Sequence, residues 1–167
     1  MRRYQESDGE AAALLVAQLS PQIYRFYVAQ VRDRAVAEDL LQDFWLRLHG
    51  ARHTYRPSEP VLPWAFAIAR RVRIDYYRRH RKRQYHEIQT EPLPDRAADE
   101  ARTGTSLHWT DLLKTLPAAQ REVILLLKVS GLSLEEVART TGSSVGAVKQ
   151  KAHRAYQKLR QLLVGEA

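Results

Sequence analysis

The chain has 167 residues and a net charge of +8 at pH 7, and 44% of its residues are hydrophobic, which is enough to form cores and excludes a disordered tail. The lack of cysteine excludes disulfides, thiolate metal sites and thiol-based sensing within the chain. No apolar run approaches the roughly 18 to 20 residues that span a bilayer, and residues 1–10 lack the apolar core of a signal peptide. We therefore expect a cytoplasmic protein whose positive charge favours a polyanionic partner: nucleic acid, an acidic protein or a membrane surface.

Residues 1–88 predict a helical domain that begins with two helices separated by a proline. Ser7 to Glu10 has the capping-box pattern, and a helical period follows through Leu14, Leu15 and Leu19. Because proline lacks an amide hydrogen and clashes with the preceding turn, Pro21 predicts a break. A second helix is predicted from there to about Val31, with a buried stripe formed by Ile23, Tyr24, Tyr27 and Val31.

The next predicted helix, residues 37–48, carries an acidic face within this basic domain. Its apolar residues recur at helical spacing, and Gly50 is the predicted stop. The opposite face presents Glu38, Asp39, Gln42 and Asp43. Such a face would repel DNA and attract a basic protein surface. An ordinary solvated face explains the pattern equally well.

A proline-rich loop follows that helix. Pro57, Pro60 and Pro63 fall within seven residues, which forbids regular helix and restrains the backbone, so the sequence predicts a stiff loop. Tyr55 and Arg56 can contact a base lodged in this loop. Packing of Tyr55 onto the domain is the equal alternative.

Pro63 to Arg83 is predicted as one helix that concentrates eight basic and four aromatic residues. At about 100° per residue, an apolar stripe contains Ala65, Ile68, Val72 and Tyr76, and the opposite side carries Phe66, Arg70, Arg73, Tyr77 and Arg81. Guanidinium groups neutralise phosphates and aromatic rings stack on bases, so this side indicates a groove for unpaired nucleic acid. A solvated basic helix, a localisation signal and a membrane-surface patch are the alternatives.

Charge and turn residues divide the chain after this helix. Residues 1–90 carry 16 basic and 10 acidic side chains, residues 91–106 carry 2 and 4, and residues 107–167 carry 9 and 5, for net charges of +6, −2 and +4. The middle segment is rich in Pro, Ala, Thr and acid without apolar periodicity, which predicts a flexible linker. We therefore expect an all-α protein with two small helical domains at 1–88 and 108–167 and a linker at 89–107 that lets them sit far apart.

The second domain has the pattern of a helix-turn-helix. A short helix closes before Pro117, and a mostly buried one runs from Ala119 to Val129. Ser133 to Glu136 is a capping box that starts a short helix ending at Gly142. Ser143 or Ser144 then caps a long last helix, whose buried stripe is predicted as Val145, Val148, Ala152, Ala155, Leu159 and Leu162.

The outward face of this last helix is polar near its beginning. It carries Lys149, Gln150, His153 and Arg154. Side chains of these types read base edges in the major groove, and Lys151 can hold a phosphate. A plain helical hairpin with a solvated polar face is the alternative.

In combination these motifs resemble the extracytoplasmic-function (ECF) sigma factors, small bacterial subunits of transcription initiation. AEDLLQDFWLRL at 37–48 resembles the family's core-polymerase-binding helix, PWAFAIARRVRIDYYRR at 63–79 resembles its helix for the minus-10 element, and residues 116–160 resemble its minus-35 domain. The resemblance implies a cytoplasmic, non-enzymatic protein that directs RNA polymerase core to promoters and nucleates melting. It implies no cofactor, metal or small-molecule substrate.

The resemblance also implies roles for particular residues. The polymerase beta-prime clamp would bind Asp39, Gln42, Asp43 and Arg47. Promoter DNA, double- and single-stranded, would meet minus-10 contacts at Tyr55, Arg56, Phe66, Arg70, Arg71, Arg73, Tyr77 and Arg78, and minus-35 contacts at Lys149, Gln150, Lys151, His153 and Arg154. Arg71 stands where the family often has Asn, so its role as base reader or phosphate contact stays open. An anti-sigma factor, often membrane-bound in this family, is the expected inhibitor.

Two other classes of protein compete with this interpretation. A stand-alone helix-turn-helix transcriptional regulator, whose first domain senses a ligand or dimerises, would bind DNA without polymerase. A metal hydrolase would use His49 and His53, or the zincin-like start at His86. Gly50 argues against the first pair because it would end the helix, and Thr90 stands where a zincin requires its second histidine.

Overall fold

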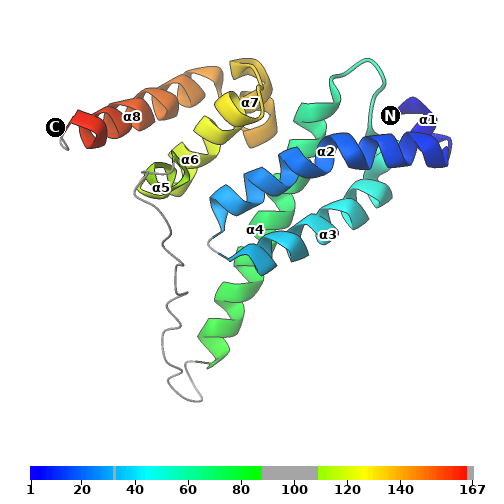
Figure 1. The fold of residues 1–167 in the computed structure, drawn as a ribbon, viewed down its shortest axis with the longest axis horizontal. Coiled ribbons are helices and arrows are strands. Elements are labelled where there is room, and N and C mark those ends of the chain that lie inside the picture. Colours follow the sequence, from blue (N-terminus) through cyan, green and yellow to red (C-terminus); the bar gives the residue numbers. More distant parts are fainter. Residues whose placement is uncertain (32, 88–108, 165–167) are drawn as a thin grey trace.

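The computed structural model describes residues 1–31, 33–87 and 109–164, and every regular element within these ranges is helical (Figure 1). The expectation of an all-α fold is therefore confirmed, while the predicted linker at 89–107 lies outside the described residues. Within the described ranges, no helix is both long and apolar enough to cross a membrane. In chain order the elements are α1 (Arg2–Gln5), α2 (Gly9–Gln30), α3 (Arg34–Ala51), η1 (Arg52–Thr54), α4 (Val61–Glu87), α5 (Trp109–Lys114), α6 (Ala118–Ile124), η2 (Leu125–Val129), α7 (Leu134–Thr141) and α8 (Val145–Val164).

The first group of helices, α1 to α4, packs around a core supplied mainly by α2, α3 and α4. Phe26 of α2 sets its ring edge-to-face against Phe66 of α4, with 5.5 Å between the ring centroids. Tyr27 donates a hydrogen bond of 3.0 Å to the carbonyl oxygen of Ala69. Burial raises the pKa of this phenol, which therefore stays neutral. Other fully buried side chains of this core are Ile23, Leu40, Phe44, Leu48 and Val72.

Helix α2 runs without interruption through Pro21, so the predicted break at this residue is wrong. A proline in a helix interior removes one hydrogen bond and costs about 3 kcal/mol. Leu19 before the proline and Ile23 after it are both buried in the core. Burying such side chains stabilises a fold by roughly 1.5 to 3 kcal/mol each. Packing on both sides of Pro21 therefore outweighs the local preference.

Two predicted helix ends lie elsewhere. Asp8, not Ser7, caps α2, since its carboxylate accepts a hydrogen bond from the amide of Ala11 while Ser7 takes a φ of 66°. That bond, together with one from Arg3, holds the pKa of Asp8 below its ordinary value. Gly50 lies inside α3, which continues past it and then tightens into the 3-10 helix η1.

The second group of helices, α5 to α8, contains the predicted helix-turn-helix in α7 and α8. Ser133 and Glu136 form a complete capping box at the start of α7, and Gly142 ends this helix with a left-handed φ of 64°. Ser144 caps α8 by accepting a hydrogen bond from the amide of Ala147. The predicted buried stripe of α8 is buried at Val148, Ala152 and Ala155. Between α6 and α7, the chain makes the π-helical turn η2.

The two groups of helices pack directly against each other (Figure 1). Helix α7 lies against α4, and α5, α6 and η2 contact α2. Helix α8 packs on α5, α6 and α7, on the side of the second group that faces away from α3. We call this the closed arrangement. It differs from the separated arrangement that a long linker would allow.

Candidate functional site

The acidic face predicted on α3 lies beside α4. Asp39 and Gln42 are exposed, whereas Asp43 is partly covered and its Oδ2 lies 3.4 Å from Nη2 of Arg79 on α4. These side chains line a hollow of about 310 Å³ together with Tyr76 and His80. The negative charge of α3 therefore reaches solvent, where a basic protein surface can approach it.

Arg47, the fourth predicted polymerase contact, is tied to α4. Its guanidinium donates a 2.5 Å hydrogen bond to the carboxylate of Asp75, and this bond holds the pKa of Asp75 below its ordinary value. The two side chains are 40% and 39% exposed. An ion pair this accessible contributes at most about 1 kcal/mol, so a partner can recruit Arg47 at small cost.

The eight residues predicted to bind the minus-10 element separate into an exposed and a covered set. The exposed set is Arg56, Arg71, Tyr77 and Arg78, and the set that is fully or partly covered is Tyr55, Phe66, Arg70 and Arg73. Arg71 and Arg78 are spaced to share one side of α4. The basic side of α4 is therefore only partly open in the closed arrangement.

Tyr55 packs onto its own domain. Only 7% of the residue is exposed, its hydroxyl donates a 2.6 Å hydrogen bond to the carbonyl of Glu59, and its ring meets the edge of Trp64. Gln5 of α1 holds the turn that precedes this loop. Its side-chain amide donates hydrogen bonds to the carbonyls of Arg52 and Tyr55 at 2.7 and 3.0 Å. The loop is therefore fixed, and the packing alternative for Tyr55 describes this arrangement.

Phe66 does not lie on an open surface. Its exposure is 0%, and its ring is enclosed in the first core beside Phe26. The expectation that Phe66 faces a nucleic-acid groove is therefore wrong for this structure. Helix α4 is covered on more than one side at this level, so a ring opposite the apolar stripe is buried as well.

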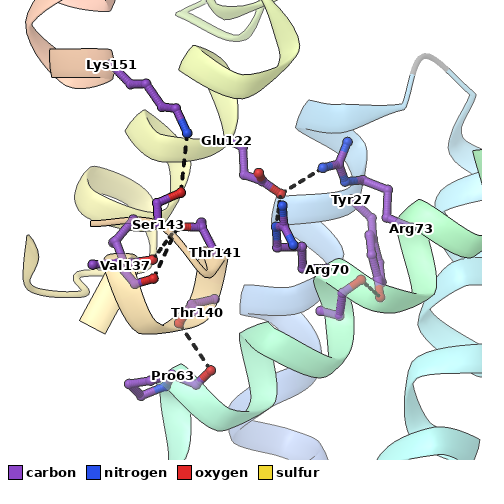
Figure 2. A network of polar contacts seen from close by, with 12 residues as sticks. Tyr27, Pro63, Arg70, Arg73, Glu122, Val137, Thr140, Thr141, Ser143 and Lys151 are labelled. Atoms are coloured by element: carbon purple, nitrogen blue, oxygen red, sulfur yellow. Dashed lines mark hydrogen bonds and ion pairs between the residues drawn. The ribbon is translucent and has the colours of Figure 1, made fainter. Parts of the chain in front are cut away.

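Arg70 and Arg73 face the second group of helices rather than solvent. Both approach the same oxygen, Oε1 of Glu122 on α6, at 3.2 Å from Nε of Arg70 and 2.7 Å from Nη2 of Arg73. Figure 2 shows the Glu122 carboxylate between the two guanidinium groups. The side chains of Glu122 and Arg73 are 8% and 11% exposed. A carboxylate of the second group therefore occupies part of the predicted DNA-binding face.

The predicted reading face of α8 is open. Lys149, Gln150, His153 and Arg154 are all exposed. Lys151 is partly covered, and its ammonium lies 3.4 Å from Oγ of Ser143, in the turn before α8 (Figure 2). Because α8 lies on the outer side of the second group, these side chains can enter a groove without rearrangement of α7 and α8.

Two family models match this chain. Residues 15–83 match the model described as Sigma-70 region 2, and residues 109–159 match the model described as Sigma-70, region 4. RNA polymerase sigma factor CarQ of Myxococcus xanthus is 35% identical over 165 residues, which cover 98% of this chain and 95% of that protein. ECF RNA polymerase sigma factor SigD of Mycobacterium tuberculosis is 32% identical over 169 residues, covering 94% of this chain and 79% of that protein.

The chain belongs to the ECF sigma factors. It is therefore a promoter-specificity subunit that directs RNA polymerase core to promoters, in a family that is not an enzyme family. This finding disfavours the stand-alone regulator. We call the first group of helices region 2 and the second group region 4 from here on.

Solved structures of sigma factors share the fold. The sigma factor RpoE from Bartonella quintana, solved with the anti-sigma factor NepR, matches with a TM-score of 0.73 and 25% identity, covering 92% of this chain and 97% of that one. CnrH, solved with the cytosolic domain of CnrY, matches with a TM-score of 0.71 and 25% identity over 98% and 96% of the two chains. Both matches extend across region 2 and region 4 of this sigma factor.

The histidines that suggested a hydrolase, His49 and His53, lie in region 2, at the end of α3 and in η1. Nδ1 of His49 lies 2.9 Å from the hydroxyl of Tyr4, and the two rings pack edge to face. His53 lies beyond the end of α3, in η1. Across the described ranges, no three His, Asp or Glu side chains come together as metal ligands.

The sequence did not lead us to two residues, Leu46 and Glu122, that lie at the predicted binding surfaces. Leu46 is 73% exposed beside Arg47, so it adds an apolar contact to the acidic face. Glu122 is the other, and its signal was present: it precedes Leu126 by four residues and therefore falls on the buried stripe of its helix. An acid on a buried stripe requires a cationic partner.

Proposed function

We propose that this ECF sigma factor recognises promoters through three separate surfaces. The acidic face of α3 binds a basic surface on the clamp of core polymerase. The exposed basic residues of α4 and its preceding loop hold the melted minus-10 strand. The beginning of α8 reads the minus-35 element in the major groove.

The observation that carries this proposal is the placement of the α8 reading face. Lys149, Gln150, His153 and Arg154 are exposed at the beginning of a helix whose start is fixed by Ser144. Helix-turn-helix proteins contact base edges with residues at this end of the second helix. Lys and Arg pair with guanine and Gln with adenine, so this set fits direct readout.

The polymerase-binding proposal is supported by charge and exposure. Asp39, Gln42 and Asp43 form a negative surface on a chain whose net charge is +8. A basic clamp surface would be attracted to this face, and DNA would be repelled from it. Leu46 supplies the exposed apolar contact that protein interfaces commonly bury.

The minus-10 proposal assigns strand contacts to Arg56, Arg71, Tyr77 and Arg78 first, because these are the exposed members of the predicted set. Melting costs about 1.4 kcal/mol per base-pair step. Stacking of a base on an aromatic ring contributes about 1 to 3 kcal/mol. Stacking on a ring such as Tyr77 can therefore offset the melting cost of roughly one base-pair step, and guanidinium groups hold the phosphates beside it. These interactions involve no chemical step by this chain.

The inhibitor and the compartment belong to the same proposal. The likeness to RpoE, solved with the anti-sigma factor NepR, and to CnrH, solved with the cytosolic domain of CnrY, supports an anti-sigma factor as a partner of this chain. We expect it to cover the acidic face and the DNA-facing surfaces. Anti-sigma factors of this family are often membrane-bound, and we expect the sigma factor itself to act in the cytoplasm, where polymerase and promoters are found.

The test is transcription reconstituted from purified core polymerase and a promoter selected by this sigma factor. Replacing Lys149 and Gln150 by alanine should reduce discrimination between the selected and a scrambled minus-35 element about tenfold or more, since each bidentate base contact is worth about 1 to 3 kcal/mol. Arg160→Ala is the matched control, because this residue is exposed on the same helix but lies far from its beginning. Unaltered discrimination in the double variant would move the readout to another surface.

A further inference from the structure

The contact between α4 and α6 joins region 2 to region 4 through one carboxylate and two guanidinium groups. Glu122 Oε1 lies 2.7 Å from Nη2 of Arg73 and 3.2 Å from Nε of Arg70 (Figure 2). Both arginines belong to the set proposed for promoter DNA. The carboxylate therefore occupies a position where a DNA phosphate would bind.

The charges at this contact do not balance. Two guanidinium groups face one carboxylate, and Nε of Arg73 finds no hydrogen-bond partner among the described residues. Nε of Arg70 lies near Glu122 without hydrogen-bond geometry. Buried charges that lack complete hydrogen bonding are costly. A DNA strand carries several phosphates and more acceptor oxygens, so it matches the pair of arginines better than Glu122 does.

The other polar contacts between region 4 and region 2 are neutral or exposed to solvent. Thr140 donates a 3.3 Å hydrogen bond to the carbonyl of Pro63 (Figure 2). Arg139 lies 3.3 Å from Glu59, with the two side chains 59% and 48% exposed, and ion pairs this exposed contribute little. The turn η2, which is strongly apolar, adds packing against α2. Among the described residues, the least exposed ion pairs between the regions are therefore those of Glu122.

We propose that region 4 is an internal competitor for promoter DNA, and that Glu122 is the residue that competes. While Glu122 holds Arg70 and Arg73, the covered part of the α4 face cannot bind a strand. Release of Glu122 separates the two regions and returns both arginines to the DNA-binding face. This inference rests on the proposed role of α4 in strand binding.

The test measures the separation of the two regions and DNA binding on the same full-length chain. The sequence has no cysteine, so a pair of introduced cysteines, Glu38→Cys on α3 and Arg160→Cys on α8, accepts spin labels at those two sites alone. Both positions are exposed. Double electron-electron resonance then reports the distance between the regions. Binding is measured by fluorescence anisotropy with a labelled single-stranded oligodeoxynucleotide of mixed sequence.

Glu122→Gln keeps the shape of the side chain and removes its charge. We expect the distance distribution to shift to longer values and DNA affinity to rise about tenfold, as follows if about one molecule in ten is open in the wild type. Glu135→Gln is the matched control, because it removes the same charge from an exposed position on α7. This control should leave the distances unchanged and affinity within about twofold, since a single exposed charge contributes little.

The double variant Arg70→Gln and Arg73→Gln removes both partners of Glu122 without altering region 4. It should lengthen the distance as Glu122→Gln does, without the gain in affinity, because it also removes two phosphate contacts. Distances unchanged in both variants would overturn the inference. Longer distances with unchanged DNA affinity in Glu122→Gln would instead overturn the assignment of the α4 face to DNA, and with it the competition. Circular dichroism of each variant confirms that the helices remain folded.

Discussion

Replacing Phe66 by alanine tests whether this ring is a core residue or a base-stacking residue. The side chain is fully buried, and its ring meets Phe26 at 5.5 Å between centroids. Truncation of a buried phenylalanine costs about 3 to 5 kcal/mol. Because domains are stable by only about 5 to 15 kcal/mol, we expect region 2 of the variant to lose a large share of its stability.

The assay for Phe66→Ala is urea unfolding followed by tryptophan fluorescence, since Trp45 and Trp64 both lie in region 2. Tyr77→Ala is the matched control, because Tyr77 lies on the same helix and is 40% exposed. Its hydroxyl donates one 3.3 Å hydrogen bond to the carbonyl of Gln30, so the control should lose only about 1 kcal/mol while impairing promoter opening. A Phe66→Ala variant that unfolds like the wild type but fails to open promoters would refute the core assignment.

Three further predictions concern charge, backbone and polymerase binding. Because the pKa of Asp75 is lowered in the fold, its charged form stabilises the protein above the ordinary pKa of 3.8, and this contribution is lost as pH falls through the lowered value. The urea midpoint should therefore fall less in Asp75→Asn than in the wild type when the pH is lowered from about 5 to about 3. In thermal unfolding, Gly142→Ala should destabilise region 4 by about 1 to 2 kcal/mol, because the residue has a φ of +64°. Gly50→Ala should stabilise region 2 by about 1 kcal/mol, because Gly50 lies inside α3 with open space around a new Cβ. Arginine at Asp39 and Asp43 should weaken binding to core polymerase by about tenfold or more in a pull-down titration, since like charges would now meet; an unchanged affinity would remove the acidic face from the polymerase interface.

Features set by neighbouring residues were predictable from the sequence. The capping box of Ser133 and Glu136 and the turn at Gly142 both formed as expected. Each depends on a side chain or a backbone angle within a few residues, and the local sequence contains all that is needed. The capping box expected at Ser7 failed by one residue, because Asp8 offers a carboxylate to the same turn.

Features set by packing were not predictable in the same way. Helical periodicity indicates which residues share a face, but it does not indicate what covers that face. Phe66 and Arg73 both lie opposite the apolar stripe of α4, yet one enters the core of region 2 and the other meets Glu122. Pro21 shows the same limit, since its helix is maintained by burial at both sides of the residue.

The hydrogen bonds from Gln5 link the beginning of the chain to the turn before the proline-rich loop. Helix α1 is a single short turn, and such termini open readily on their own. Each opening of α1 releases the carbonyls of Arg52 and Tyr55 together. Amide hydrogen exchange in residues 52–59 should therefore follow the fraying of α1, which makes the order of the loop a property of a segment about fifty residues away in the chain.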